Sequence, residues 1–401
     1  MKINTLRIAL KGICTYRGIC KTWMMERIMG LLEAIEAGQG EAAVAHYTEI
    51  FYQLRRAGHA GLGDWLEEHL RYDEEPYALL AEQGGSDPAL ESAARRDVET
   101  FALLAALDCD KLIDAMQKLL PGEYQTMLTN LPRWKAGAPF DFDSLTEFYR
   151  THGTGDFARS RAFVWENGRL TPVLQPDCPT ERELLGYDSQ RETVIANTRA
   201  LIEGHAVNNV LLYGDSGTGK SATVKSLLSV EGFDDLRIIE LQKDGLADMP
   251  ALIRQLGQRR QKFILFIDDL AFDQDDRTYS VLKTILEGGV EKRPANVAIY
   301  ATSNRRHLVR QTFSDRSGDE VDIGETIQEK TALADRFGLR VLYLPLNKAE
   351  YLNLVEKLAD LDGVEYERED LRAQAVQWEM HNQSRTPRTA RQFIASLKTY
   401  G

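Results

Sequence analysis

An apolar run followed by a glycine-rich loop decides the fold of this chain: Val210-Leu211-Leu212-Tyr213-Gly214-Asp215-Ser216-Gly217-Thr218-Gly219-Lys220-Ser221. The part from Gly214 onward matches the phosphate-loop pattern G-x-x-x-x-G-K-[ST]. Glycines allow the backbone to curl so that successive N–H groups point at phosphate oxygens, and the helix expected from about Lys220 adds its positive dipole end. The pattern predicts binding of a nucleoside triphosphate, with Lys220 on the β- and γ-phosphates and the Ser221 hydroxyl on Mg²⁺.

A second apolar segment, Phe263 to Ile267, ends in two carboxylates, Asp268 and Asp269. A buried strand there would deliver Asp268 to the Mg²⁺ coordination shell through water. Asp269 stands where such enzymes usually place a glutamate that polarises the attacking water. Aspartate is one methylene shorter than glutamate, which leaves the rate of turnover open. Paired carboxylates after a strand are also a common turn signal, but the phosphate loop before them favours the metal site.

A third apolar segment, Val297 to Tyr300, continues into small polar residues and reaches Asn304. If this segment lies beside the preceding strand, the Asn304 amide is placed near the two carboxylates, where it could orient water against the γ-phosphate. The alternative is a strand-ending cap. Two arginines follow: Arg336, after a predicted helix over Ile327 to Ala334, and Arg388, at the start of the last helix. An isolated arginine at a helix end is more often a dipole partner or a surface ion pair.

The alternation of strands and helices from Asn208 onward predicts an α/β fold with a five-stranded parallel sheet and helices on both faces. After Pro345 the pattern is purely helical to the end of the chain. The predicted strands are Val210 to Tyr213, Arg237 to Leu241, Phe263 to Ile267, Val297 to Tyr300 and Val341 to Leu344.

Apolar residues recur at three- and four-residue spacing from about Met25 to Arg150, which predicts a helical domain with no chemistry of its own. The periodicity then stops, and Ala162 to Leu174 reads as a short hairpin that turns at Asn167-Gly168. We place the domain junction at this hairpin. The predicted segments are residues 1–24, a helical N-terminal domain over 25–152, a linker with the hairpin over 153–180, an α/β core over 181–346 and a helical lid over 347–401.

The first 23 residues carry basic side chains and no acidic one. Charges interrupt every apolar run, which argues against a cleaved export signal. We expect a misplaced start or a disordered extension, with an amphipathic membrane-surface helix as the alternative. On this interpretation, removing residues 1–23 leaves the fold and ATP binding unchanged. The basic residues are Lys2, Arg7, Lys11, Arg17 and Lys21.

The composition of the chain excludes several classes of protein. With 401 residues, 43% hydrophobic and 27% charged, the chain is long enough for two or three globular domains. A formal net charge of −12 argues against nucleic-acid binding over the whole surface, although a local basic groove stays open. No apolar stretch approaches the roughly 18 residues of a membrane span. The cysteines lack paired spacing, which favours reduced thiols in the cytoplasm over a zinc site: Cys14, Cys20, Cys109 and Cys178.

The order of these motifs from Leu185 to the C-terminus resembles the AAA+ ATPases. The residues within these motifs resemble those of one uncharacterised bacterial family of ATP-binding proteins that contain a domain of unknown function. The likeness extends through the helical N-terminal part, where Phe163 to Trp165 and Leu170 to Val173 look like the family's linker, and residues 1–24 lie outside it. It rests on Leu184 to Asp188, Asn208 to Asp215, Phe266 to Leu270, Leu286 to Gly289, Tyr300 to Leu308 and Asp335 to Leu339.

The resemblance implies a role for several residues. Asn304 would be the first sensor, and Arg336 the arginine finger that completes a neighbouring subunit's site. Arg388 would be the second sensor, carried by the lid, and Arg391 is its rival because it lies one helical turn further on. The family also has a second aspartate at the position of Asp269. Three residues would lie near the adenine: Leu185, Gly186 and Tyr187.

The sequence thus predicts a Mg²⁺-dependent ATPase of the AAA+ class that works as a homo-oligomer, either a ring or a filament. It would remodel or load an unidentified protein partner through its N-terminal domain. The alternative is a low-turnover, ATP-dependent switch or loader that acts through protein–protein binding. A kinase is a third possibility, but no acceptor-binding lid with clustered arginines stands out.

Overall fold

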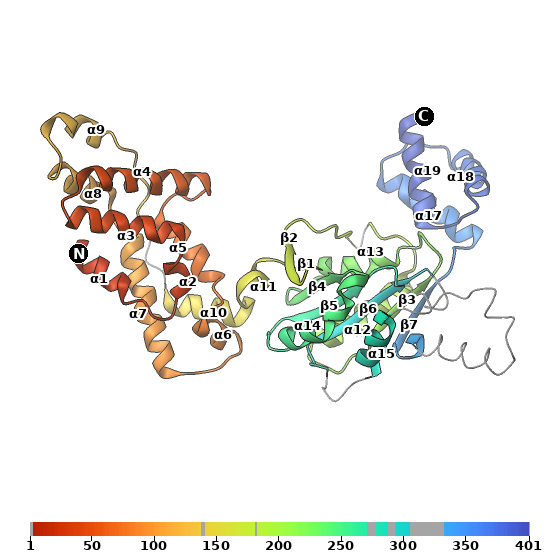
Figure 1. The fold of residues 1–401 in the computed structure, drawn as a ribbon. Coiled ribbons are helices and arrows are strands. Elements are labelled where there is room, and N and C mark those ends of the chain that lie inside the picture. The colour runs from red at the N-terminus through yellow and green to blue at the C-terminus, as the bar shows by residue number, and fades with distance from the viewer. Residues whose placement is uncertain are drawn as a thin grey trace. The chain divides into compact units, whose positions relative to one another are not determined.

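The computed structural model describes residues 3–137, 141–180, 183–270, 277–287, 293–304 and 333–400 (Figure 1). The chain divides into two compact units, Met1–Arg159 and Ser160–Gly401. One hydrophobic core lies in the first unit, and the second unit has separate cores beside the sheet and in the C-terminal helices. No helix in the described part of the chain is long and apolar enough to cross a membrane.

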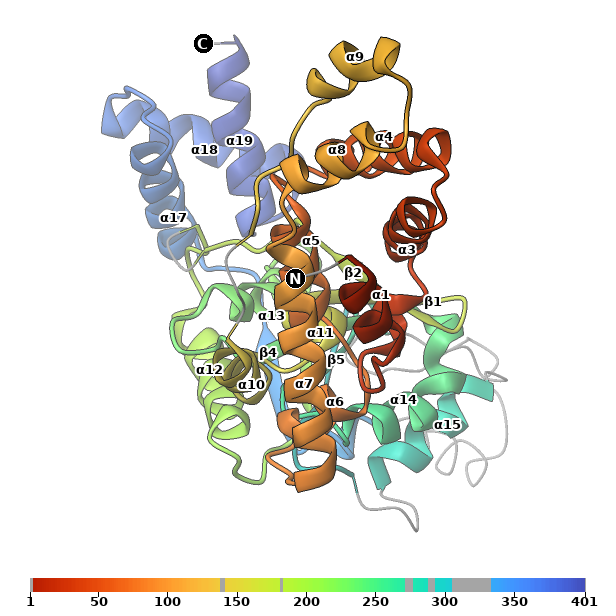
Figure 2. The same ribbon diagram turned by 90° about the vertical axis from the view of Figure 1, so that its left-hand side faces the viewer.

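The first unit is built from helices throughout its described residues, as the periodicity predicts (Figures 1 and 2). The longest of them, α7, begins where Asp87 accepts hydrogen bonds from the N–H groups of Ala89 and Leu90, with Pro88 at the first helical position. Its helices are α1 (Ile3–Lys11), α2 (Arg17–Cys20), α3 (Trp23–Glu36), α4 (Gly40–Arg56), α5 (Leu62–Arg71), α6 (Pro76–Glu82), α7 (Pro88–Ala105), α8 (Cys109–Gln117), a 3₁₀ turn (Gly122–Tyr124), α9 (Gln125–Thr129), α10 (Phe142–His152) and α11 (Gly155–Arg159).

The structure corrects the expectation of a disordered extension over residues 1–24. Helices α1 and α2 pack into the core of the first unit, and Leu6, Leu10 and Tyr16 are each at most 4% exposed. Two of the basic residues that interrupted the apolar pattern, Arg7 and Lys11, lie on α1, and Lys11 pairs with the Glu33 carboxylate of α3 at 2.8 Å. Arg7 pairs with the Glu36 carboxylate of α3 at 2.6 Å, so the charges are neutralised while the apolar side chains point inward.

A buried carboxylate anchors this N-terminal segment. The side chain of Asp97, on α7, is fully buried and accepts hydrogen bonds from the Cys14 N–H at 2.9 Å and the Thr15 N–H at 2.7 Å. It also accepts a hydrogen bond from the Thr15 hydroxyl at 2.7 Å. A buried carboxylate needs donors to replace its lost hydration, and residues 14 and 15 provide them. The turn between α1 and α2 is therefore part of the folded unit.

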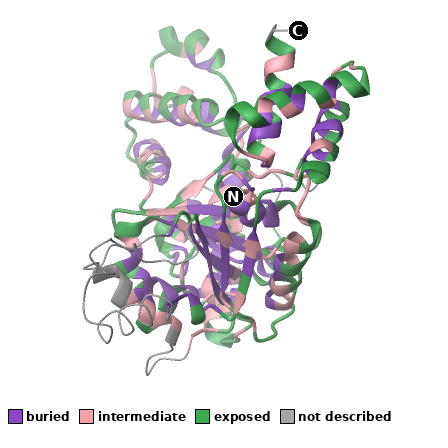
Figure 3. Cartoon of the chain, turned by 90° about the vertical axis from the view of Figure 1, so that its right-hand side faces the viewer, coloured by how far each residue is buried: buried purple, intermediate pink, exposed green. Residues whose placement is uncertain are grey.

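The second unit contains a seven-stranded sheet in the order β2-β1-β4-β5-β6-β3-β7. All neighbouring pairs are parallel except β1 and β2. This confirms the predicted α/β fold with a mostly parallel sheet. Figure 3 shows the central strands largely buried, which explains their uninterrupted apolar sequences. The strands are β1 (Ala162–Glu166), β2 (Arg169–Val173), β3 (Val210–Gly214), β4 (Leu236–Leu241), β5 (Lys262–Ile267), β6 (Val297–Ser303) and β7 (Leu339–Tyr343).

The predicted number of strands, five, was too low. The hairpin expected as a linker forms with its turn at Asn167 and Gly168, but its first strand also pairs in parallel with β4, from Ala162 opposite Ile238 onward. Phe163, in this first strand, is buried. The hairpin therefore extends the sheet by two strands.

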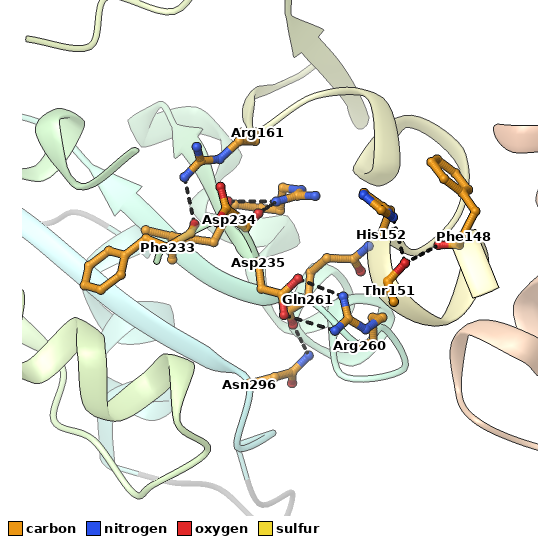
Figure 4. A network of polar contacts seen from close by, with 12 residues as sticks. Phe148, Thr151, His152, Arg161, Phe233, Asp234, Asp235, Arg260, Gln261 and Asn296 are labelled. Carbon is orange, nitrogen blue, oxygen red and sulfur yellow. Dashed lines mark hydrogen bonds and ion pairs between the residues drawn. The ribbon is translucent and has the colours of Figure 1, made fainter. Parts of the chain in front are cut away.

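Polar contacts fix the start of β4, at the end of the strand remote from the phosphate loop (Figure 4). Arg161 donates a hydrogen bond to the Phe233 carbonyl at 2.7 Å. The Arg260 guanidinium makes two hydrogen bonds to the Asp235 carboxylate, at 2.7 and 3.0 Å. Such paired contacts have a defined direction, so they hold the loops before β4 and β5 in one arrangement.

Helices pack against the sheet, and three more follow it. One apolar cluster joins α12 and α13 to alternate side chains of β3 and β5, including Leu212 and Phe266. The C-terminal helical segment has its own small core, against which Leu185 and Tyr187 are partly buried. The helices of this unit are α12 (Asp188–Ile202), α13 (Lys220–Lys225), 3₁₀ turns (Ser226–Ser229 and Lys243–Asp248), α14 (Met249–Leu256), α15 (Arg277–Glu287), α17 (Lys348–Leu361), α18 (Arg368–Asn382) and α19 (Pro387–Tyr400).

Replacing Asp97 with alanine is expected to lower the free energy of unfolding by about 2–4 kcal/mol, because the two N–H groups and the hydroxyl of residues 14 and 15 lose their buried acceptor. Chemical denaturation followed by circular dichroism measures the change. The control is Asp143→Ala, since the Asp143 side chain is 71% exposed and pairs with Arg95. Loss of that pair should cost less than about 1 kcal/mol. Equal losses for the two variants would contradict the anchoring role of Asp97.

Candidate nucleotide-binding site

The phosphate loop connects the end of β3 to α13. At Gly214, φ is +131°, and a β-carbon there would lie 2.0 Å from the Tyr343 carbonyl oxygen of β7. The next N–H, that of Asp215, donates to the same oxygen at 3.0 Å. Gly217 and Gly219 also have positive φ values, +77° and +96°, which favour glycine. Glycine is therefore required at Gly214 because the β7 backbone lies so close, and it is favoured at Gly217 and Gly219 because their backbones are left-handed.

Lys220 is buried beneath this loop, with only 5% of its surface exposed. Its Nζ donates to the carbonyl oxygens of Gly214 at 3.1 Å and Asp215 at 2.7 Å. A third hydrogen bond, 2.8 Å long, reaches Oδ1 of Asn304 at the end of β6. Burial lowers the pKa of Lys220 from its ordinary value, and nearby carboxylates, that of Asp215 foremost, oppose this shift. The ammonium group is thus held by oxygens of two strand ends.

Ser221 and Asp268 bring a hydroxyl and a carboxylate together beside Lys220. The Ser221 Oγ donates to Asp268 Oδ1 at 2.6 Å. Mg²⁺ prefers such oxygen ligands, and it usually takes one or two carboxylates together with water and substrate phosphates. Among the described residues, no group of three or more His, Cys, Asp and Glu side chains is placed to hold a metal ion. The residues present therefore fit Mg²⁺ that is shared with a nucleotide.

Asp269 and Asn304 form a second polar pair at the same edge. The Asn304 Nδ2 donates to Asp269 Oδ1 at 2.8 Å, and both residues are exposed. The Asn304 amide therefore links the ammonium of Lys220 to the Asp269 carboxylate. Asp269 has a left-handed backbone with φ of +51°, which is uncommon outside glycine but tolerated by aspartate.

These groups line a cleft of about 770 Å³ that also contains the start of α19. Arg388 and Arg391 both line it, but they are held differently. The Arg388 backbone N–H donates to the Gly217 carbonyl at 3.2 Å, which places Arg388 beside the loop. The Arg391 guanidinium donates to the Glu183 carbonyl. Arg391 thus ties α19 to the segment that precedes α12.

The residues expected near the adenine line a smaller pocket of about 30 Å³, together with Thr218 and Gly219 of the loop. The Tyr187 hydroxyl donates to the Leu344 carbonyl at 2.6 Å, and its ring lies 5.0 Å from that of Tyr343. A pocket of this size has room only for one or two water molecules, since each needs roughly 10–15 Å³. An adenine ring therefore fits only after neighbouring side chains move. The expected residues are Leu185, Gly186 and Tyr187.

Arg336 lies apart from the residues that line this cleft. It is exposed in the turn between residues 333–335 and β7, beside Asp335, which pairs with Arg340 at 2.7 Å. Most of the predicted helix over Ile327 to Ala334 falls outside the described residues, as do Gly288, Gly289 and residues 305–308 of the family motifs.

Sequence reasoning missed Thr302. Its hydroxyl contacts both acidic positions that follow β5, donating to Asp268 Oδ1 and accepting the N–H of Asp269 at 2.9 Å. The available signal was its place in the short polar run after the apolar part of β6. That run was interpreted only for Asn304.

A family model described as "Protein of unknown function (DUF815)" matches residues 158–400. The chain belongs to the DUF815 family. This confirms the predicted resemblance to a family that carries a domain of unknown function, but the match begins at residue 158 and does not include the helical N-terminal part to which the likeness was expected to extend. Comparison of this DUF815 protein with curated proteins finds no match.

Solved structures with a related fold include forms of RuvB from Thermotoga maritima. Two single-residue variants are 19% and 18% identical, with TM-scores of 0.38 and 0.36. They align with 54% and 53% of the DUF815 chain and with 62% and 61% of their own chains, which is less than two thirds. A form titled the RuvB Holliday junction branch migration motor is 15% identical, with a TM-score of 0.34, over 53% of this chain and 69% of that one. These likenesses concern the fold alone.

Gly214→Ala is expected to destabilise the second unit by about 1–3 kcal/mol more than Gly204→Ala. Both glycines have positive φ, but a β-carbon added at Gly204 would meet no heavy atom within 4 Å, whereas the Tyr343 carbonyl blocks that position at Gly214. Urea denaturation of the two variants measures the difference. Similar destabilisation would show that the close approach of β7 to the loop is unimportant.

Proposed function

We propose that this DUF815 protein is a Mg²⁺-dependent ATPase of the AAA+ class. One observation carries the proposal: five polar side chains from the phosphate loop, the end of β5 and the end of β6 converge at one sheet edge. Hydrogen bonds of 2.6–2.8 Å join them in two groups, Lys220 with Asn304 and Asp269, and Ser221 with Asp268. The five are Lys220, Ser221, Asp268, Asp269 and Asn304.

ATP binding would use the phosphate loop in its observed place. The backbone N–H groups of residues 214–221 would receive the phosphates, and Lys220 would transfer its hydrogen bond from Asn304 to a phosphate oxygen. Ser221 and Asp268 would hold Mg²⁺, with Asp268 acting through water. When bound, the ion supplies charge neutralisation for the β- and γ-phosphates.

Asp269 would orient the attacking water, and Asn304 would set the direction of the Asp269 carboxylate. The 2.8 Å hydrogen bond between their side chains supports this pairing. Once Lys220 turns to a phosphate, the Asn304 Oδ1 is free to accept a hydrogen bond from the same water. This would give Asn304 the function of a first sensor.

The arginines of the cleft would divide two tasks. Arg388 lies beside Gly217 and would serve as the second sensor that meets the γ-phosphate. Arg391 is engaged by the Glu183 carbonyl, which favours a structural contact over that role. The adenine would lie against Leu185, Gly186 and Tyr187 once the small pocket widens.

We further propose a homo-oligomer, a ring or a filament, in which Arg336 completes a neighbour's site. Its exposure and its position outside the cleft of its own chain support an action across a subunit boundary. The N-terminal helical unit would bind the protein partner that is remodelled or loaded. The four cysteines are free, in keeping with a reducing cytoplasm.

The short side chain of Asp269 favours a second candidate, a low-turnover switch or loader. Steady-state ATPase activity at rising protein concentration separates the two. An ATPase that remodels or loads its partner requires hydrolysis that rises as the subunits assemble. A switch or loader requires tight ATP binding and almost no turnover.

Lys220→Ala is expected to abolish measurable ATP binding, because the loop loses its buried side-chain cation. Isothermal titration calorimetry with ATP and Mg²⁺ measures this, and circular dichroism verifies the fold. Lys262→Ala removes the same charge at the start of β5, the far end of that strand, and should bind as the unaltered protein does. Normal affinity in a folded Lys220→Ala protein would refute the site.

Arg336→Ala should preserve ATP binding while lowering hydrolysis by about 10³-fold, since a trans arginine stabilises charge that develops on the γ-phosphate. Mixing it with Lys220→Ala subunits should restore some hydrolysis, because one type of interface then combines an intact loop with an intact arginine. Size-exclusion chromatography confirms that the two variants assemble together. A co-assembled mixture without activity, or full activity of Arg336→Ala alone, would count against the finger.

A further inference from the structure

Thr302 lies at the edge of the sheet where β3, β5 and β6 end, beside the phosphate loop. It belongs to β6, which lies between β5 and β3 and runs parallel to both. The register pairs Leu212 with Thr302 on one side and Ile267 with Ala301 on the other, so Thr302 faces the first residue after β5, Asp268. Only 2% of Thr302 is exposed.

The Thr302 hydroxyl uses both of its hydrogen-bonding capacities on the carboxylate pair. It donates its proton to Asp268 Oδ1, and it accepts the backbone N–H of Asp269 at 2.9 Å. The Thr302 carbonyl also accepts the N–H of Leu270 at 2.7 Å. A hydroxyl has one proton and two lone pairs, so both contacts form at once. One side chain therefore fixes one acidic residue through its carboxylate and the next through its backbone.

These contacts determine the direction of each acidic side chain. Asp268 Oδ1 receives the hydroxyls of Thr302 and Ser221, which leaves the carboxylate little freedom to rotate. The Asp269 backbone is held in the left-handed region with φ of +51°, and its N–H is satisfied there by Thr302. This conformation directs the Asp269 carboxylate to the Asn304 amide.

We propose that Thr302 is a positioning residue that aligns Asp268 for Mg²⁺ and Asp269 for the attacking water. The inference rests on the proposed function and deepens it. It also gives a physical account of an aspartate in the position of a glutamate. With a shorter side chain, the reach of the carboxylate depends more on the backbone, and Thr302 holds that backbone in place.

The test replaces Thr302 with valine, which keeps the branched shape and burial but removes the hydroxyl. Binding of a fluorescent, non-hydrolysable ATP analogue is titrated with Mg²⁺, and Mn²⁺ binding is followed by electron paramagnetic resonance. Thr302→Val should raise the half-saturating metal concentration by about 10–100-fold, as loss of outer-shell partners does at metal sites. Its affinity for the analogue in EDTA should stay unchanged, and Thr302→Ser should restore metal binding. Thr302→Ala gives the same test if the valine variant is unstable.

The matched control is Thr198→Val, on α12. Thr198 is likewise fully buried, and its hydroxyl hydrogen bonds within the helix and with the Tyr300 hydroxyl at 2.8 Å. This variant should alter stability without altering the metal dependence. Two results would overturn this inference and leave the proposed function standing. One is a folded Thr302→Val protein with unaltered metal dependence, and the other is a Thr302→Ser protein that binds the metal as weakly as Thr302→Val. Absence of Mg²⁺-dependent analogue binding in the unaltered protein would instead overturn the proposed function, and the inference with it.

Discussion

The buried ammonium group of Lys220 constrains the edge of the sheet at which β3, β5 and β6 end. A cation that loses most of its hydration needs oxygen atoms close by, and here they come from two backbone carbonyls of its own loop and from Asn304. The loop carbonyls can turn inward only because the chain reverses tightly at glycine. The third oxygen requires β6 to lie next to β3. The shape of the loop and the order of the strands thus both provide oxygen acceptors for the buried Lys220 ammonium group.

Strand order then brings the remaining polar groups within reach. Since β6 lies between β3 and β5, its polar end meets the loop on one side and the carboxylates on the other. On the far side of β3, the Tyr343 carbonyl of β7 receives the Asp215 N–H. The loop is therefore supported from both neighbouring strands. Parallel strands present these ends at one edge, which is why groups far apart in sequence form one site.

The parts of this site that the sequence predicted are those in which a short local pattern carries the chemistry. The phosphate loop and the two carboxylates after β5 are such patterns, and the α/β fold follows from alternating elements. The pairing of β1 with β4 depends on residues far apart in the chain, so a local hairpin signal could not reveal it. The basic residues of α1 concealed its apolar face, because their partners lie on α3. Thr302 carries no distinctive motif, and only the register between β5 and β6 gives it a role.

The C-terminal helices are connected to the phosphate loop itself. The Gly217 carbonyl accepts the Arg388 N–H, and a β-carbon at Gly217 would lie 3.1 Å from the side chains of Thr386 and Arg388. The Arg391 guanidinium reaches the Glu183 carbonyl at the other side of the cleft. A shift of the loop would change the first contact, and a widening of the small pocket, which Glu183 and Arg391 also line, would change the second. A bound nucleotide would therefore alter the position of the helical segment through two contacts that differ in chemistry, one from backbone and one from a charged side chain. Under the proposed function, these two contacts would link occupancy of the loop and the pocket to the position of the helical segment.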